Sequence, residues 1–113
     1  MKKGRRDRSC PPFVALSKDL LLKRHEFWDL SPAARDLYLL LKSRYTGANN
    51  GTIRLYYSEI KKLKISGLRG DKVISRAFFE LEAEGWILRT KIGGLHRFIN
   101  EYRLSGKHDQ LFL

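Results

Sequence analysis

The residues best suited to bind a ligand lie in one stretch near the middle of the chain, DKVISRAFFELEAEGWI. If this stretch is helical, one stripe collects four side chains at the spacing i, i+3, i+4 and i+7: Lys72, Ser75, Arg76 and Phe79. Lysine and arginine bind phosphates or guanine, and serine binds a base edge or a phosphate. Arg69 adds positive charge just before the helix, whose N-terminus itself favours a phosphate. The stripe predicts a nucleic-acid contact, with an ordinary solvated helix face as the alternative.

Further basic residues fall into three groups. A predicted hairpin around Gly93-Gly94 carries Arg89, Lys91, His96 and Arg97. A predicted short helix carries Lys61, Lys62 and Lys64. The N-terminal segment carries Lys2, Lys3, Arg5 and Arg6. Long basic side chains at these places suit phosphate contact, which positions a protein on nucleic acid; the alternatives are charge protection of an edge strand and a frayed terminus without a role.

The overall charge agrees with this reading. The 113 residues include 23 Lys and Arg against 12 Asp and Glu, a formal net charge of +11. A domain this basic typically meets a polyanion, although a basic surface can also simply aid solubility. No window approaches the roughly 20 apolar residues of a membrane span, so we expect no membrane partner. The single cysteine, Cys10, excludes an intrachain disulfide and favours a cytoplasmic location.

The sequence carries no pattern typical of an enzyme. It has no glycine-rich phosphate loop, no His-Glu-x-x-His and no serine in a nucleophile elbow. The three histidines fall on different predicted elements, without metal-ligand spacing: His25, His96 and His108. Glu80 and Glu84, at i and i+4, are expected to be solvated and not to form a catalytic pair. We therefore expect a binding protein without catalytic residues, metal or cofactor.

Two helices are predicted in the first half of the chain. Ser17 can cap a helix over 18–28, whose apolar side includes Leu20, Leu21, Phe27 and Trp28. Ser31-Pro32 is a stronger start signal for a helix over 32–45. The core face of that helix is expected to contain Ala33, Leu37, Leu40, Leu41 and Arg44, flanked by Tyr38 and Tyr45.

The middle of the chain predicts a turn, a strand and two helices. TGANNG is a turn, and a short strand is expected over 52–57. Ser58 can cap a helix over 59–64 that turns Ile60 and Leu63 inward, and ISGLRG is a loop. The helix over 71–84 has Asp71 as its cap and Gly85 as its stop. Its core stripe consists of Ile74, Phe78 and Leu81.

A two-stranded hairpin is predicted after Gly85, where the apolar period changes to two. A two-residue turn at Gly93-Gly94 would pair Ile92 with Leu95. One face of the hairpin would then hold Ile87, Arg89, Lys91, His96, Phe98, Asn100 and Tyr102. Neither face is purely polar, and a longer loop that includes Leu95 would change the register.

The predicted order of elements is that of an α+β winged helix-turn-helix. It is mostly helical and ends in a β-hairpin wing. The second helix of the pair would lie in the major groove. The predicted organisation is a disordered basic arm over 1–12, a winged-helix domain over 13–104 and a tail over 105–113.

Two stretches resemble known families. ISRAFFELEAEGWI resembles the recognition helix and the start of the wing in bacterial and phage winged-helix regulators. FWDLSPAARDLYLLLKSRYTGANNG is similar to the upstream helix and Asn-Asn-Gly turn of winged-helix proteins of mobile elements, including phage and plasmid replication proteins. The resemblance implies double-stranded DNA as the partner, for transcription regulation or replication initiation. Such helices commonly expose a polar residue where this chain has Phe79.

Two alternatives to duplex DNA remain open at this stage. Winged-helix domains also serve as protein-interaction modules, and Phe79 and the terminal Leu-Phe-Leu favour that alternative. RNA is a second alternative, because charge alone does not separate the two nucleic acids. A homodimer is a candidate assembly under any of these functions, and Phe79 is expected to pack under the N-terminal segment or against a second subunit.

Overall fold

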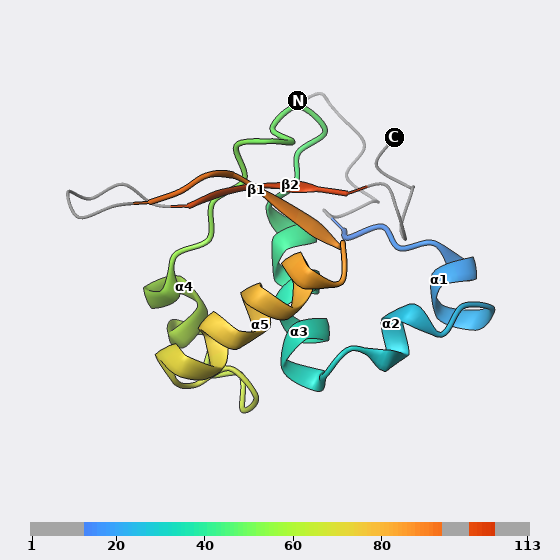
Figure 1. The fold of residues 1–113 in the computed structure, drawn as a ribbon, viewed down its shortest axis with the longest axis horizontal. Coiled ribbons are helices and arrows are strands. Elements are labelled where there is room, and N and C mark those ends of the chain that lie inside the picture. The colour runs from blue at the N-terminus through green and yellow to red at the C-terminus, as the bar shows by residue number, and fades with distance from the viewer. Residues whose placement is uncertain (1–12, 94–99, 106–113) are drawn as a thin grey trace, which may run out of the picture.

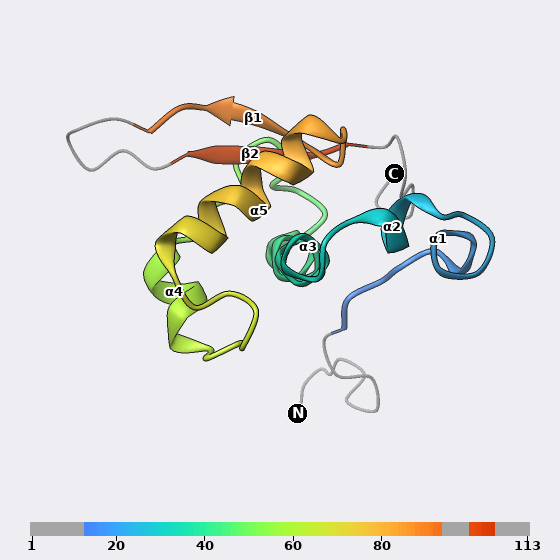
Figure 2. The ribbon, with the colours of Figure 1, turned by 60° about the horizontal axis from the view of Figure 1, so that its bottom comes forward.

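The computed structural model describes residues 13–93 and 100–105, which form an α+β fold (Figure 1). The helices are α1 (Lys18–Leu22), α2 (Glu26–Asp29), α3 (Pro32–Arg44), α4 (Tyr57–Lys62) and α5 (Asp71–Ala83). The strands are β1 (Ile87–Lys91) and β2 (Glu101–Leu104), which pair antiparallel. α5 lies beneath the hairpin and beside α3, whereas α1 and α2 lie at the opposite end of the molecule from α4 (Figures 1 and 2).

The helix predicted over 18–28 is wrong, because α1 and α2 are separate short helices. Ser17 does cap α1, since its Oγ accepts from the Asp19 N–H at 3.2 Å. The N–H groups of Lys23 and Arg24 then both donate to the Asp19 carbonyl, at 3.0 and 3.1 Å, which closes the helix. The break lets α2 turn Phe27 into the core.

Helix α3 begins where the sequence predicted and forms the centre of the core. The Ser31 Oγ accepts from the Ala34 N–H at 3.2 Å, and Pro32 occupies the first turn. The face differs from the expectation by about one residue. Tyr38 is fully buried, packed edge-on to Trp86 at 5.0 Å between ring centroids, while Arg44 is exposed.

The strand predicted over 52–57 is reduced to a single bridge, Ile53 with Tyr102, which places residue 53 on the free side of β2. Helix α4 begins at Tyr57, so Ser58 lies inside the helix and is not its cap. Glu59 stabilises this start, because its Oε1 accepts from the Tyr56 N–H at 3.0 Å. Ile60 is buried as predicted, but Leu63 is 56% exposed, contrary to prediction.

Helix α5 confirms its predicted core stripe, because Ile74, Phe78 and Leu81 are all buried. The N-cap, however, is Gly70 and not Asp71, which lies in the first turn. The stop is as predicted: Gly85 has φ of +82°, a conformation that glycine adopts without the steric cost of a Cβ.

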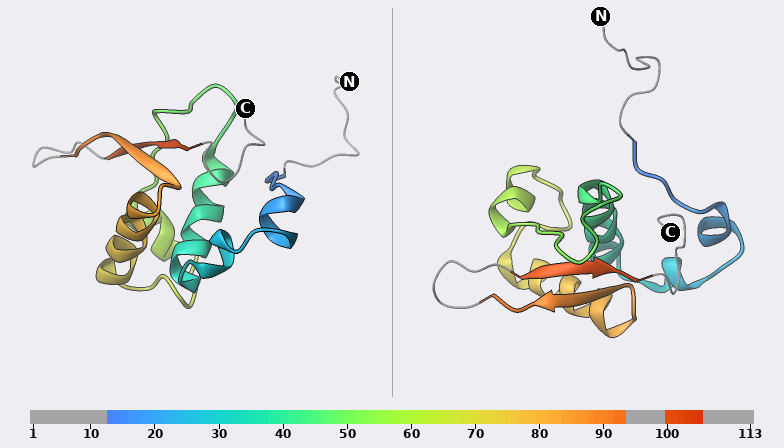
Figure 3. Two further views of the ribbon diagram at one scale, coloured as in Figure 1. Left: turned by 45° about the vertical axis from the view of Figure 1, so that its right-hand side comes forward. Right: turned by 90° about the horizontal axis from the view of Figure 1, so that it is seen from above.

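The hairpin register differs from the predicted one. Ile87 pairs with Leu104 and Arg89 with Tyr102, with an irregularity between Arg89 and Lys91. The predicted two-residue turn, with Ile92 opposite Leu95, lies partly outside the described residues, and the described pairs do not follow the register that this turn would set. Figure 3 shows the two strands from above, lying over α5. The order of elements, together with the Ile53 bridge, is compatible with a winged helix.

Candidate nucleic-acid interface

The outward stripe of α5 is placed as the sequence predicted. Lys72, Ser75 and Arg76 are exposed, and Phe79 is 70% exposed. Within residues 13–93 and 100–105, neither Lys72 nor Arg76 has an ion-pair partner. The described residues do not cover Phe79, so the expected packing under an N-terminal segment is not found among them. The stripe therefore combines free cations with one exposed aromatic ring.

The basic residues of the α4 region lie close to the start of α5. Lys61 Nζ and Asp71 Oδ1 are 2.7 Å apart, which joins α4 to the first turn of α5. Both side chains are exposed, so this ion pair contributes little to stability and can exchange for another anion. Lys62, Lys64 and Arg69 are exposed on α4 and the connection to α5.

Two acidic residues in the C-terminal half of α5, Glu80 and Glu82, are bound by partners within the fold. Glu80 accepts from the Ser31 N–H at 2.8 Å and from the Ser31 Oγ–H at 2.7 Å. The expectation that Glu80 is solvated is therefore wrong, because its carboxylate holds the N-terminus of α3. Glu82 Oε1 lies 3.0 Å from the Arg89 guanidinium. The Glu80 carboxylate is thus satisfied by hydrogen bonds, and the Glu82 charge is offset by a cation.

The predicted hairpin residues divide into three groups. Arg89 points toward α5, where it pairs with Glu82, while Lys91 is exposed. His96 and Arg97 lie outside the described residues, as do Lys2, Lys3, Arg5 and Arg6 of the arm. The structure adds Arg103, exposed on β2 opposite Leu88, which sequence reasoning missed. Its outward position follows from the register, so only the correct register could have indicated it.

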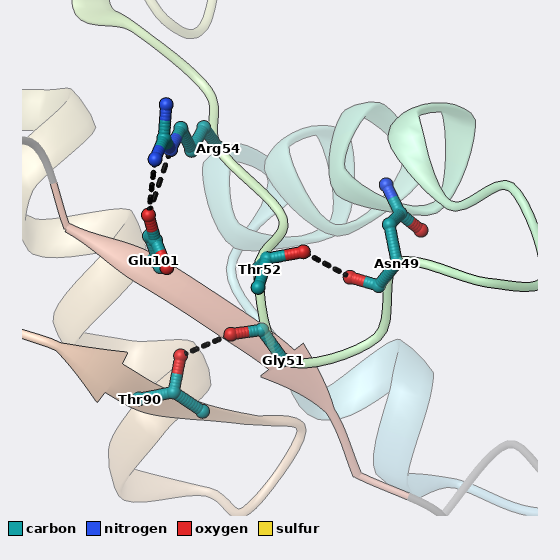
Figure 4. Close-up of polar contacts among 6 residues, drawn as sticks. All are labelled: Asn49, Gly51, Thr52, Arg54, Thr90 and Glu101. Atoms are coloured by element: carbon teal, nitrogen blue, oxygen red, sulfur yellow. Dashed lines mark hydrogen bonds and ion pairs between the residues drawn. The ribbon is translucent and has the colours of Figure 1, made fainter.

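The hairpin is tied to the turn after α3 and to the segment that follows this turn (Figure 4). The Arg54 Nε donates to Glu101 Oε2 at 2.8 Å, and this contact raises the pKa of Arg54. The Thr90 hydroxyl donates to the Gly51 carbonyl, and Thr52 Oγ1 donates to the Asn49 carbonyl at 3.1 Å. These contacts fix the position of the hairpin relative to the helices.

Asn50 ties the same turn to the end of β2. Its Oδ1 accepts from the Leu104 N–H at 2.7 Å, and its Nδ2 donates to the Leu104 carbonyl at 3.3 Å. The side-chain amide thus satisfies both backbone groups of one strand residue, as a neighbouring strand would.

Helix α4 is fixed to α3 by a surface pair. Arg44 Nη2 lies 2.6 Å from Glu59 Oε2. The pKa of Glu59 is lowered, first by the hydrogen bond from the Tyr56 N–H and then by that from Arg44. This exposed pair links the helix that carries Lys61 and Lys62 to the central helix.

A notch of about 130 Å³ lies between α5 and the hairpin. Its floor is a stack of rings: Phe78 lies 4.9 Å from Tyr102 and 6.0 Å from Tyr57, with interplanar angles of 13° and 8°. Burial raises the pKa of Tyr102 to about 12, although a hydrogen bond from Asn100 acts in the opposite direction. Sequence reasoning missed this notch, because Tyr57 was assigned to a strand.

A larger cavity of about 230 Å³ lies elsewhere, between the segment 13–15 and the C-terminal end of α3. Its lining includes Phe13, Val14 and Tyr45, and it shares no residue with the stripe. The described part of the chain has no group of three His, Cys, Asp or Glu side chains that could hold a metal ion. In residues 13–93 and 100–105, no helix has the length and apolar character of a membrane span.

We compared the chain with protein-family models, with curated proteins and with solved structures, and none of them matches it.

Proposed function

We propose that this protein binds double-stranded DNA as a winged helix. The observation that carries the proposal is the stripe of Lys72, Ser75 and Arg76, which is exposed, lies in the N-terminal half of α5 and adjoins further exposed cations. In this proposal α4 and α5 are the helix-turn-helix pair and β1 with β2 is the wing. The N-terminal half of α5 lies in the major groove, where such helices reach base edges.

The two contact types have different roles. Arg76 can donate two hydrogen bonds to one guanine, which distinguishes sequences. Lys72, Lys62 and Lys91 supply point charges for phosphates, which hold any duplex. The inward bonding of Glu80 and the pairing of Glu82 support this arrangement, because free carboxylates on the same helix would repel the phosphates. The biological role of the binding is transcription regulation or replication initiation for a mobile element.

Binding is measured by titrating a labelled duplex with protein at two salt concentrations. We expect micromolar or tighter affinity at low salt, and a slope of log K against log salt of about −0.9 for each phosphate neutralised. A duplex drawn from a selection on a random pool is then compared with a random duplex. The absence of binding to any duplex at low salt would refute the proposal.

Single substitutions separate the two roles. Arg76→Ala should lose discrimination between selected and random duplexes, whereas Lys91→Ala should weaken both alike. Lys18→Ala is the matched control, because it removes the same charge from α1, at the far end of the molecule from α4 (Figure 1). Equal effects of Arg76→Ala on selected and random duplexes would remove Arg76 from base recognition.

A further inference from the structure

The notch between α5 and the hairpin adjoins the proposed DNA-binding stripe. Ser75 and Phe79 line it from α5, and Arg89 lines it from β1. Lys72 and Arg76 lie on the same outward stripe, one to two turns toward the N-terminus of α5 from Phe79. A ligand that occupies the notch therefore lies next to the positive charges expected to hold a phosphate chain.

The size of the notch restricts its occupant. Its volume of about 130 Å³ is well below the 300–1,000 Å³ typical of pockets for whole small molecules. The walls are aromatic, with Phe78 and Tyr102 stacked in the floor and Phe79 70% exposed at the rim. A single exposed phenylalanine is ordinary on a protein surface. Here, however, the ring borders a concave site, so it can cover one face of a single planar ring.

The polar groups of the notch suit an occupant with a hydrogen-bonding edge. Among the described residues, the Ser75 hydroxyl has no hydrogen-bond partner. Arg89 uses its Nη2 for Glu82, and its other guanidinium N–H groups can bind an acceptor. Because this pairing offsets the charge of Glu82, the notch does not repel an occupant attached to phosphates. A nucleobase meets these requirements, because it is a planar ring with acceptor atoms that is attached to a phosphate chain.

We propose that the notch holds one unpaired base of the bound DNA, stacked on Phe79, while Lys72 and Arg76 bind neighbouring phosphates. The base must be unpaired because a base inside a duplex already has both faces covered by its neighbours. The inference rests on the proposed function and adds its substrate class: duplex DNA that carries an unpaired nucleotide.

The test compares two labelled duplexes that are identical except for one unpaired nucleotide in the second. Base–aromatic stacking contributes about 1–3 kcal/mol per base, so the wild-type protein should bind the second duplex roughly 5- to 150-fold more tightly. Phe79→Ser should remove this preference, so that the variant binds the two duplexes with equal affinity. Phe79→Trp should retain it. Val73→Ser, which shortens another exposed apolar side chain of α5, is the matched control and should keep the wild-type preference.

The outcomes distinguish this inference from the proposed function. Tight binding of both duplexes with no preference, or a preference that survives Phe79→Ser, overturns the notch and leaves duplex binding intact. Failure to bind either duplex at low salt overturns both. Light scattering tests whether the notch instead holds a second copy of the chain. That occupant would be indicated by a dimeric wild type and a monomeric Phe79→Ser variant, together with no preference of the wild type for the duplex with the unpaired nucleotide.

Discussion

The two hydrogen bonds between Glu80 and Ser31 join α5 to α3, and we expect Glu80→Ala to lower the free energy of unfolding substantially. Glu80→Ala removes the acceptor of two hydrogen bonds, from the Ser31 N–H and from its Oγ–H. The Ser31 hydroxyl keeps a role, since it still accepts from the Ala34 N–H. The Ser31 N–H, in contrast, loses its partner in a part-buried position. The damage is therefore to the join between α5 and α3 and not to the helix cap itself.

The expected magnitude follows from the two bonds. A hydrogen bond to a charged group contributes about 1.5–3 kcal/mol. Two such bonds would give about 3–6 kcal/mol, but both share one carboxylate, and water can reach this part-buried site. Alanine also favours the helix by a few tenths of a kcal/mol relative to glutamate. We therefore expect Glu80→Ala to lower the free energy of unfolding by about 2–3 kcal/mol.

Urea unfolding followed by far-UV circular dichroism measures this loss. Ser75→Ala, on the exposed side of the same helix, is the control and should stay within about 0.5 kcal/mol of wild type. A double-mutant cycle with Ser31→Ala isolates the part carried by the Oγ–H bond, with a coupling of about 1 kcal/mol or more. A Glu80→Ala variant as stable as Ser75→Ala would refute the argument, because the carboxylate would then be no better bound in the fold than in water.

Three further predictions concern stability. Leu68→Ala should lower the free energy of unfolding by about 2–5 kcal/mol in urea titrations, because Leu68 is fully buried although it lies in a loop. Gly85→Ala should cost about 1–2 kcal/mol, measured as a lower melting temperature, since φ at that position is +82°. The pKa of Tyr102 is raised to about 12 in the folded protein, whereas tyrosine in an unfolded chain has a pKa of about 10. As pH rises from about 10 to about 12, the unfolded chain therefore loses this proton first, and the free energy of unfolding should fall by roughly 2–3 kcal/mol. Above about pH 12 this contribution should level off. Urea midpoints of Tyr102→Phe at pH 9 and 12 should lack this part of the alkaline loss, and an identical loss in both proteins would contradict the assignment.

The sequence predicted the elements whose signals are local. Ser31-Pro32 marked the start of α3, and the spacing of Ile74, Phe78 and Leu81 marked the buried side of α5. Gly85 marked the end of that helix, because glycine adopts the positive φ found there without the steric cost of a Cβ. In each case neighbouring residues alone determine the conformation.

The sequence failed where distant residues decide the conformation. The segment 52–57 has the composition of a strand, but Tyr102 is its only ladder partner among the described residues, so it forms a single bridge there. The register of the described strands follows from Ile87 and Leu104 entering the core together, and the glycine pair alone pointed to a different register. The outward stripe of α5 was predictable because it follows, like the core stripe, from the spacing of residues along one helix. The notch was not, because it depends on Tyr57 and Tyr102 meeting Phe78 in space.

The central position of β2 has a consequence for how the chain folds. β2 lies between β1 and Ile53. Two hydrogen bonds that hold this region join residues far apart in the chain: Arg54 and Glu101 are separated by 47 positions, and Asn50 and Leu104 by 54. Such long-range closures are slow compared with helix formation, because the entropy of the intervening loop is lost before the contacts form. During synthesis the helices can form early, yet the sheet stays open until residue 105 has left the ribosome. We therefore expect a chain that ends before β2 to keep helical circular dichroism and to lack a cooperative unfolding transition.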